Sequence, residues 1–192
     1  MMPSRRLFLG SAGIGLAWLH AFPALSRGFK TIPQKPSARV IVDNDFAGDP
    51  DGLVALAHQL LSPKTVVPLI TSSALNPKFI EAHLKGNSAV KGQDIARELV
   101  RRLALNTKIA VEAGSETLTL EPTAAARAIV TEAMRDDPVP LFVTCGGPLT
   151  NVAAALMLEP AIAGRFTLIW IGGGAYPAGG WEYNLTTDTE AA

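Results

Sequence analysis

The chain alternates short apolar runs with segments whose apolar residues recur at helical spacing. The apolar runs predict five buried strands, at residues 39–42, 66–71, 108–112, 139–144 and 167–171. Helical periodicity predicts helices between them, at residues 52–61, 93–105, 124–134 and 149–158. Apolar strands that alternate with helices are typical of a parallel sheet buried on both faces. The pattern therefore predicts an α/β fold of three layers, an open and mostly parallel sheet with helices on both faces.

Polar and glycine-rich segments follow four of the five predicted strands. They lie at residues 43–52, 71–76, 145–147 and 172–174. In open α/β sheets, ligands bind beyond the carboxyl ends of the strands. Since all four segments follow strand ends, we expect them to meet at one edge of the sheet and form a single site there.

The first of these segments is strongly acidic. Asp43, Asp45, Asp49 and Asp51 place four carboxylates within nine residues. Carboxylates this close repel one another unless a cation or strong hydrogen bonds compensate. Oxygen ligands suit Ca²⁺ or Mg²⁺ rather than Zn²⁺, and the sequence has no Cys/His pair at zinc spacing. The segment therefore predicts a site for a hard cation.

Composition narrows the possible partners. The 192 residues carry 17 basic and 17 acidic side chains, so no excess of positive charge favours nucleic acid or an anionic membrane. With 48% hydrophobic residues, the chain can build one domain with a substantial core. The single cysteine, Cys145, excludes an internal disulfide and is expected to be a small buried apolar residue.

The N-terminus has the pattern of a targeting segment. Arg5 and Arg6 precede a mostly apolar stretch of small residues, 10–21, which resembles a twin-arginine export signal and is short for a membrane span. We expect a signal peptide at 1–26, a proline-containing linker at 27–37 and a domain at 38–192. This organisation predicts a periplasmic or secreted protein with no membrane attachment in its mature form.

Four segments, in order, resemble the signature of the inosine-uridine preferring nucleoside hydrolases. The acidic run is similar to that family's Asp-x-Asp-x-Gly-x-Asp-Asp, and residues 70–76 to its Ile-Thr-Thr-x-x-Gly-Asn. Residues 147–151 repeat its Gly-Pro-Leu-Thr-Asn. Residues 172–174, 182–184 and 188–192 resemble its Gly-Gly-Gly, Glu-Phe-Asn and Asp-x-Glu-Ala-Ala. The resemblance runs from residue 39 to the last residue and implies a Rossmann-like core.

The resemblance implies a Ca²⁺-dependent hydrolysis of the N-glycosidic bond of ribonucleosides. Ribose and free base would form through an oxocarbenium-like transition state. The substrate would be a small ribonucleoside or related riboside; a homo-oligomer is left open. Asp45 would be the general base. The implied metal ligands are Asp45, Asp49, Asp51 and the Gly146 carbonyl, with Asp43 behind them, and the implied ribose contacts are Asn76, Glu182 and Asn184.

The sequence departs from the family pattern at several points. Pro50 separates the two aspartates, so either Asp49 and Asp51 form the expected pair, or Asp51 takes its first place and Gly52 leaves the second empty. Proline in a first helical turn favours Asp49 as the N-cap, but the sequence leaves the choice open. Ala47 replaces a glycine, and no asparagine precedes Glu182 in the glycine-rich segment.

The end of the chain is a further departure. The family pattern continues beyond residue 192 with another aspartate ligand and a histidine near the leaving base. We therefore expect a truncated member of the family, which would bind metal weakly and turn over slowly.

One other function fits the sequence, and two more are weighed against it. A non-catalytic periplasmic nucleoside- or sugar-binding protein, or an inactive paralogue, would keep the site without the reaction. Haloacid-dehalogenase-like phosphatases also begin with a strand ending in Asp-x-Asp, but there a Thr or Val usually follows, where this chain has Phe46. The triplet 172–174 lacks the Gly-x-Gly-x-x-Gly spacing of a dinucleotide site.

Two local expectations accompany this interpretation. In the turn at 147–151, either a carbonyl or amide points at a ligand, or Thr150 or Asn151 caps the following helix in an ordinary strand–helix turn. At residues 181–184, an extended segment would point Glu182 and Asn184 in the same direction, toward vicinal hydroxyls of a sugar.

Overall fold

The computed structural model describes residues 35–48, 50–105 and 108–192. The expected signal peptide at 1–26 and most of the linker lie outside these residues, so the domain division remains a prediction. None of the described helices is both long and apolar enough to cross a membrane. The elements, in chain order, are β1 (Ala38–Asn44), α2 (Asp51–Leu61), β2 (Thr65–Ser72), η2 (Ala82–Leu84), α3 (Ser88–Arg102), β3 (Ala110–Ala113), α4 (Ala124–Ala133), β4 (Leu141–Cys145), α5 (Thr150–Leu158), η3 (Pro160–Gly164), β5 (Thr167–Trp170) and α6 (Tyr183–Thr187).

The five strands form one parallel sheet in the order β3-β2-β1-β4-β5. Each predicted strand is present, with boundaries within two residues of those expected, and the predicted α/β class is confirmed. The chain runs from β1 to β2 and β3 on one side, and then returns to β4 and β5 on the other. This reversal creates a topological switch point between β1 and β4, where open α/β sheets bind ligands.

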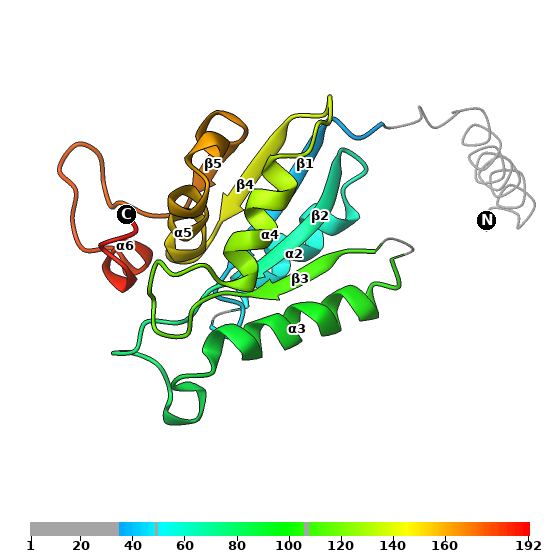
Figure 1. Ribbon diagram of the computed structural model, residues 1–192. Helices are drawn as coiled ribbons and strands as arrows, with labels where there is room; N and C mark the ends of the chain where they lie inside the picture. The colour runs from blue at the N-terminus through cyan, green and yellow to red at the C-terminus, as the bar shows by residue number, and fades with distance from the viewer. Residues whose placement is uncertain (1–34, 49, 106–107) are drawn as a thin grey trace, which may run out of the picture. The chain divides into compact units, whose positions relative to one another are not determined.

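Alternation along β1 directs its side chains into two separate cores. Ile41 packs with buried residues of α4, α5 and β4, whereas Val40 and Val42 pack with those of α2, α3 and β3. In Figure 1, α4 and α5 lie in front of the sheet and α2 lies behind it. The sheet is therefore the middle of three layers, and β1 is buried on both faces.

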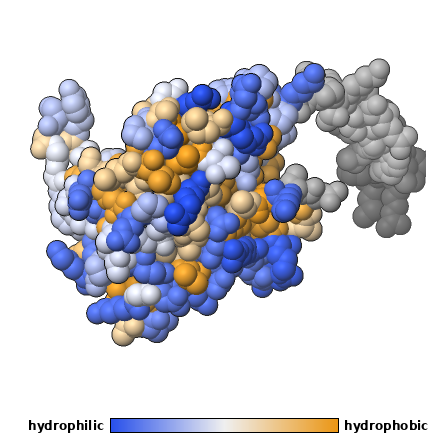
Figure 2. Space-filling model, viewed as in Figure 1, coloured by the Kyte–Doolittle hydropathy of each residue, from blue (hydrophilic) through white to orange (hydrophobic). Residues whose placement is uncertain are grey.

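The edge strand β5 differs from the expectation of complete burial. Leu168 and Ile169 are 38% and 52% exposed, and Ile171, just after the strand, is also exposed. β5 pairs with β4 alone among the described strands, so its outer edge and part of its faces lack cover there. Figure 2 shows hydrophobic residues at the surface among polar ones on the face in view.

Helix α3 begins five residues before its predicted start and ends three before its predicted end. At its start, the carboxylate of Glu116 accepts hydrogen bonds from Ala89 N and Val90 N, at 3.0 and 2.8 Å. The first amides of a helix have no partner within the helix, and Asn87, the N-cap, makes no side-chain bond to them. The carboxylate of Glu116, from a distant loop, takes that place. Beyond the helix, Ala104 has a φ of 48°, a left-handed conformation that stops it.

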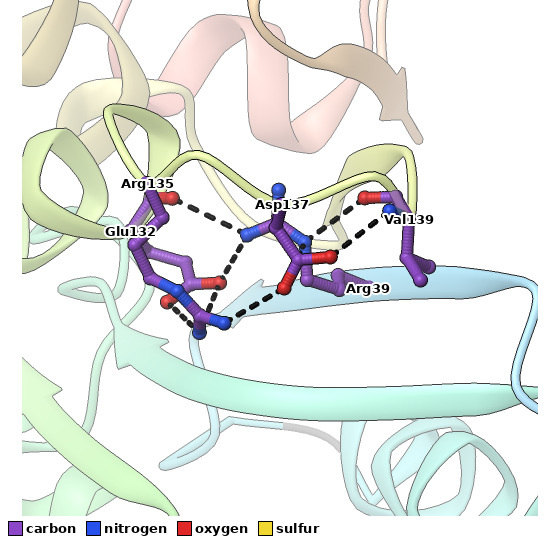
Figure 3. Close-up of polar contacts among 5 residues, drawn as sticks. All are labelled: Arg39, Glu132, Arg135, Asp137 and Val139. Atoms are coloured by element: carbon purple, nitrogen blue, oxygen red, sulfur yellow. Dashed lines mark hydrogen bonds and ion pairs between the residues drawn. The ribbon is translucent and has the colours of Figure 1, made fainter.

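A charged network joins the amino-terminal ends of β1 and β4, opposite the carboxyl edge (Figure 3). Arg39 Nη1 contacts Glu132 Oε1 at 2.5 Å, and Arg39 Nε donates to the Val139 carbonyl at 3.0 Å. Arg135 bridges Glu132 and Asp137, at 2.9 and 2.8 Å. The Arg39 and Glu132 side chains are only 6% and 10% exposed, so each depends on the other for compensation.

Removing one charge of this network should destabilise the fold. In Glu132→Gln, the Arg39 guanidinium stays buried without its closest carboxylate, and we expect a loss of about 3 kcal/mol of unfolding free energy. Urea denaturation measures it. Glu98→Gln is the matched control, because the Glu98 pairs with Arg101 and Arg102 lie on the surface of α3 and should matter little. Equal unfolding midpoints for the two variants would contradict this prediction.

Candidate functional site at the carboxyl edge of the sheet

The acidic segment forms the end of β1 and the turn into α2. Asp45 follows the strand and is half-buried, and its carbonyl accepts a hydrogen bond from Gly48 N at 2.8 Å. Asp51 is exposed and is the first residue of α2. The N-cap of α2 is Pro50, whose carbonyl accepts hydrogen bonds from α2 amides, so the expectation of Asp49 as N-cap is wrong. Asp49 lies outside the described residues, and its metal-binding role remains a prediction.

Asp43 is buried completely and accepts hydrogen bonds from three elements. Its carboxylate receives Thr71 Oγ1 of β2 at 2.6 Å, Asn151 Nδ2 of α5 at 2.8 Å, and Cys145 Sγ of β4 at 3.4 Å. Strand register explains this arrangement, because Asp43 pairs with Thr71 on one side and with Cys145 on the other. Burial raises the pKa of the Asp43 carboxyl, and the three hydrogen bonds oppose that rise.

Cys145 is buried as expected, but it is more than an apolar filler. Its thiol donates to Asp43 and contacts the Gly147 carbonyl at 3.3 Å. Burial, followed by the nearby Asp43 charge, raises the pKa of the Cys145 thiol well above its usual value. A thiol in this state is a poor nucleophile.

Asn44 fills the space between the acidic turn and β4. Its Oδ1 accepts a hydrogen bond from Asp45 N at 2.9 Å. A Cβ added at Gly52 would lie 2.7 Å from Asn44 Nδ2, and one added at Gly146 only 2.4 Å from the same atom. The two glycines therefore make room for this side chain, which holds the backbone of Asp45.

The turn at 147–151 supplies the next part of the site. Neither Thr150 nor Asn151 caps α5, because the N-cap is Leu149 and makes no side-chain capping bond. Thr150 Oγ1 instead donates a hydrogen bond to Asp188 at 2.5 Å, and Asn151 Nδ2 donates one to Asp43. The capping expectation is therefore wrong: both side chains bind carboxylates from distant parts of the chain.

Glu182 and Asn184 lie at the start of α6, not on an extended segment. Glu182 is the N-cap of α6, and its carboxylate accepts hydrogen bonds from the amides of Asn184, Leu185 and Gly173. Asn184 Nδ2 donates to the carbonyls of Gly146 and Ile171, at 3.1 and 2.8 Å. The expectation of an extended segment through both residues is wrong, because α6 begins at Tyr183, between them.

A cavity of about 520 Å³ opens at this edge of the sheet. It brings together four of the predicted site residues, Asp45, Asp51, Gly146 and Asn184. The other described ones, Asp43, Asn76 and Glu182, are not among its lining residues. Asp43 binds side chains of neighbouring elements, whereas Asn76 and Glu182 accept backbone amides. The remaining lining residues are Ala47, Gly48, Leu75, Phe79, Ile80, Glu81, Leu84 and Tyr183.

Much of the cavity wall comes from a segment to which the sequence pattern assigned no element. Residues 75–84 follow β2 and contribute Phe79 and Ile80, together with the short helix η2. In the sequence, this part of the wall could have been recognised from Phe79 and Ile80, two large apolar residues between Asn76 and the polar stretch that follows. Tyr183 was also missed, although it lies between two predicted ribose contacts.

The donors around the cavity fit a hard cation. Carboxylates of Asp45 and Asp51 and the carbonyl of Gly146 provide oxygen ligands only. The Gly146 carbonyl accepts one hydrogen bond from Asn184, which leaves a lone pair for a cation. Among residues 35–48, 50–105 and 108–192, no group of three or more His, Cys, Asp or Glu side chains is placed to hold a metal.

Comparisons with known proteins agree on one family. A model of the inosine-uridine preferring nucleoside hydrolases matches residues 40–192. The pyrimidine-specific ribonucleoside hydrolase RihA of Salmonella arizonae is 32% identical over 161 residues, which are 74% of this chain and 52% of the relative. RihA of Salmonella paratyphi A is 31% identical over 172 residues, 80% of this chain and 55% of the relative. The chain thus spans about half the length of these relatives.

Solved structures share the fold. An inosine-guanosine nucleoside hydrolase superposes with a TM-score of 0.60 at 21% identity, over 81% of this chain and 56% of that one. An inosine-uridine preferring nucleoside hydrolase from Bacillus anthracis also gives 0.60, at 17% identity, over 80% of this chain and 60% of that one. At these identities the likeness establishes the fold.

The environment of Cys145 predicts a protected thiol. In the native protein at pH 8, we expect iodoacetamide to alkylate Cys145 roughly 100-fold more slowly than in urea, because burial and the Asp43 carboxylate keep the thiol protonated. Since Cys145 is the only cysteine, mass spectrometry of the intact protein reads this site alone. Equal rates in both conditions would contradict a buried, protected thiol.

Proposed function

The chain belongs to the inosine-uridine preferring nucleoside hydrolase family, and on that basis we propose that it hydrolyses the N-glycosidic bond of ribonucleosides to ribose and free base. The observation that carries the proposal is the convergence of Asp45, Asp51, Gly146 and Asn184 on one cavity at the switch point of the sheet. The relatives named as pyrimidine-specific ribonucleoside hydrolases support the substrate class.

We propose Ca²⁺ as the cofactor, held by Asp45, Asp51 and the Gly146 carbonyl, with Asp49 completing the acidic segment. All of these donors are oxygens, which Ca²⁺ prefers. A bound Ca²⁺ would orient the ribose hydroxyls and acidify water in the cavity. Asn44 and Asn184 prepare these ligands, because one holds the backbone amide of Asp45 and the other holds the Gly146 carbonyl.

Asp45 is the proposed general base. Its carboxylate borders the cavity, half-buried, where it can accept a proton from the water that attacks the sugar. As the base departs, positive charge develops on the ribosyl group in an oxocarbenium-like transition state. Asp45 and Asp51 both line the cavity, and their negative charges would stabilise that cation.

Asn184 is the ribose contact that the geometry supports best. Both hydrogens of its amide are used by the carbonyls of Gly146 and Ile171, so its Oδ1 is the atom left to accept from a sugar hydroxyl. Asn76 and Glu182 stay proposed ribose contacts. Their oxygens already accept backbone amides, from Lys78 for Asn76 and from the start of α6 for Glu182, and contact with ribose would use their remaining lone pairs.

The proposed location is the periplasm or the cell exterior. It rests on the twin-arginine-like segment at residues 1–26 of the sequence. Fusing these residues to a reporter protein and following its export in a bacterium tests the proposal.

Substitution of Asp45 should strongly slow base release. We expect Asp45→Asn to lower the rate of ribose release from inosine and uridine by roughly 100-fold or more, because the neutral amide accepts no proton. A reducing-sugar assay, run with added Ca²⁺ and again with a chelator, measures the rate. Asp94→Asn is the control, since Asp94 lies on the exposed face of α3.

Two results would contradict the proposed reaction or its cofactor. Full activity in Asp45→Asn would exclude Asp45 as the base, and release that is insensitive to the chelator would exclude the metal. Calorimetry on the wild-type chain distinguishes the enzyme from a non-catalytic binding protein. Binding of Ca²⁺ and ribose without hydrolysis of any nucleoside would indicate the binding protein.

A further inference from the structure

Tyr183 connects two segments that lie far apart in the sequence. It is the first residue of α6 and lines the cavity. Its phenol oxygen accepts a hydrogen bond from the backbone amide of Asn76 at 3.3 Å, across 107 residues of chain. The contact joins the glycine-rich C-terminal segment to the segment that follows β2.

Asn76 is the residue on which the cavity wall folds. Its carbonyl accepts hydrogen bonds from Phe79 N and Ile80 N, both at 3.1 Å, and its Oδ1 accepts Lys78 N at 3.0 Å. Phe79 and Ile80 are the wall residues of this turn. The position of the Asn76 backbone therefore decides where these two side chains stand in the cavity.

Apolar packing alone holds this wall weakly. The rings of Phe79 and Tyr183 are 6.2 Å apart and tilted, and Phe79 meets Trp181 edge-on at 6.4 Å. Phe79 and Trp181 are nevertheless 64% and 70% exposed. A ring that is mostly in water gains little from burial, so a directional hydrogen bond at Asn76 contributes more to the position of the wall.

Helix α6 is anchored firmly enough to act as the fixed side of this contact. Asn184 binds the carbonyls of Gly146 and Ile171 at the exits of β4 and β5. Asp188, just after the helix, accepts Thr150 Oγ1 of α5. The sheet therefore positions α6, and Tyr183 transmits that position to residues 76–80.

We propose that Tyr183 is a positioning residue whose phenol oxygen sets the shape of the cavity wall at Phe79 and Ile80, and thereby the affinity for the nucleoside. The hydroxyl of Tyr183 positions the wall through its bond to Asn76, whereas the residue itself lines the cavity. The effect on affinity rests on the proposed function, whereas the hydrogen bond to Asn76 does not.

The test compares Tyr183→Phe with a matched control, Tyr176→Phe. Both substitutions remove one phenol oxygen. Tyr176 lies in the glycine-rich stretch that precedes α6, and its side chain is 99% exposed. In Tyr183→Phe, we expect amide hydrogen exchange to accelerate at Asn76 and in the peptide 76–84, with no change in α4. In the reducing-sugar assay, KM should rise roughly 2- to 10-fold, as for one lost hydrogen bond, with kcat within about twofold. Tyr176→Phe should leave both readouts unchanged.

The outcomes separate this inference from the reaction itself. Unchanged exchange at 76–84 in Tyr183→Phe would overturn the proposal, and so would faster exchange with an unchanged KM. A loss of kcat at constant KM would also overturn it, because that pattern marks a transition-state contact. If the wild-type protein released no ribose, the proposed reaction would fail, and the exchange comparison would still decide whether the phenol holds the wall.

Discussion

A carboxylate buried in the middle of a parallel sheet must find hydrogen-bond donors, and Asp43 finds three of them in three different elements. The strand register provides two, because Thr71 and Cys145 are its direct neighbours in β2 and β4. The third comes from Asn151 in α5, which must approach the sheet for the bond to form. Because the same short segment carries Asp45 and Asp51, satisfying Asp43 also fixes where the exposed part of the acidic turn begins.

Hydrogen bonds extend outward from this buried centre to the cavity. Thr150, beside Asn151, binds Asp188 and so places the end of α6 against α5. Within α6, Asn184 binds the Gly146 carbonyl, one residue beyond Cys145 in β4. In the motif at 147–151, the side chains of Thr150 and Asn151 therefore bind carboxylates of Asp188 and Asp43, which lie outside the motif. The polar residues that border the cavity are therefore positioned by hydrogen bonds among residues buried beneath it.

The sequence was sufficient for the strands, for most helices and for the edge at which the site lies, because periodicity and strand exits are local properties. What it could not provide were contacts between distant segments. Glu116 binds the first amides of α3, and Asp188 binds Thr150 at the start of α5. Likewise, nothing near Tyr183 in sequence indicates Asn76 as its partner. Each of these bonds depends on how separate loops meet above the sheet, which only the assembled fold determines.

The departures of the acidic turn from the family pattern become understandable at Asn44. In one of the two alternatives that the sequence leaves open, Gly52 takes the place of a carboxylate. In space, the Asn44 amide lies so close to the α-carbons of Gly52 and Gly146 that a side chain at either position would displace it. Asn44 in turn holds the amide of Asp45. Glycine at position 52 is thus coupled to asparagine at position 44, and restoring an aspartate at 52 alone would disturb the carboxylate at 45 rather than add a ligand beside it.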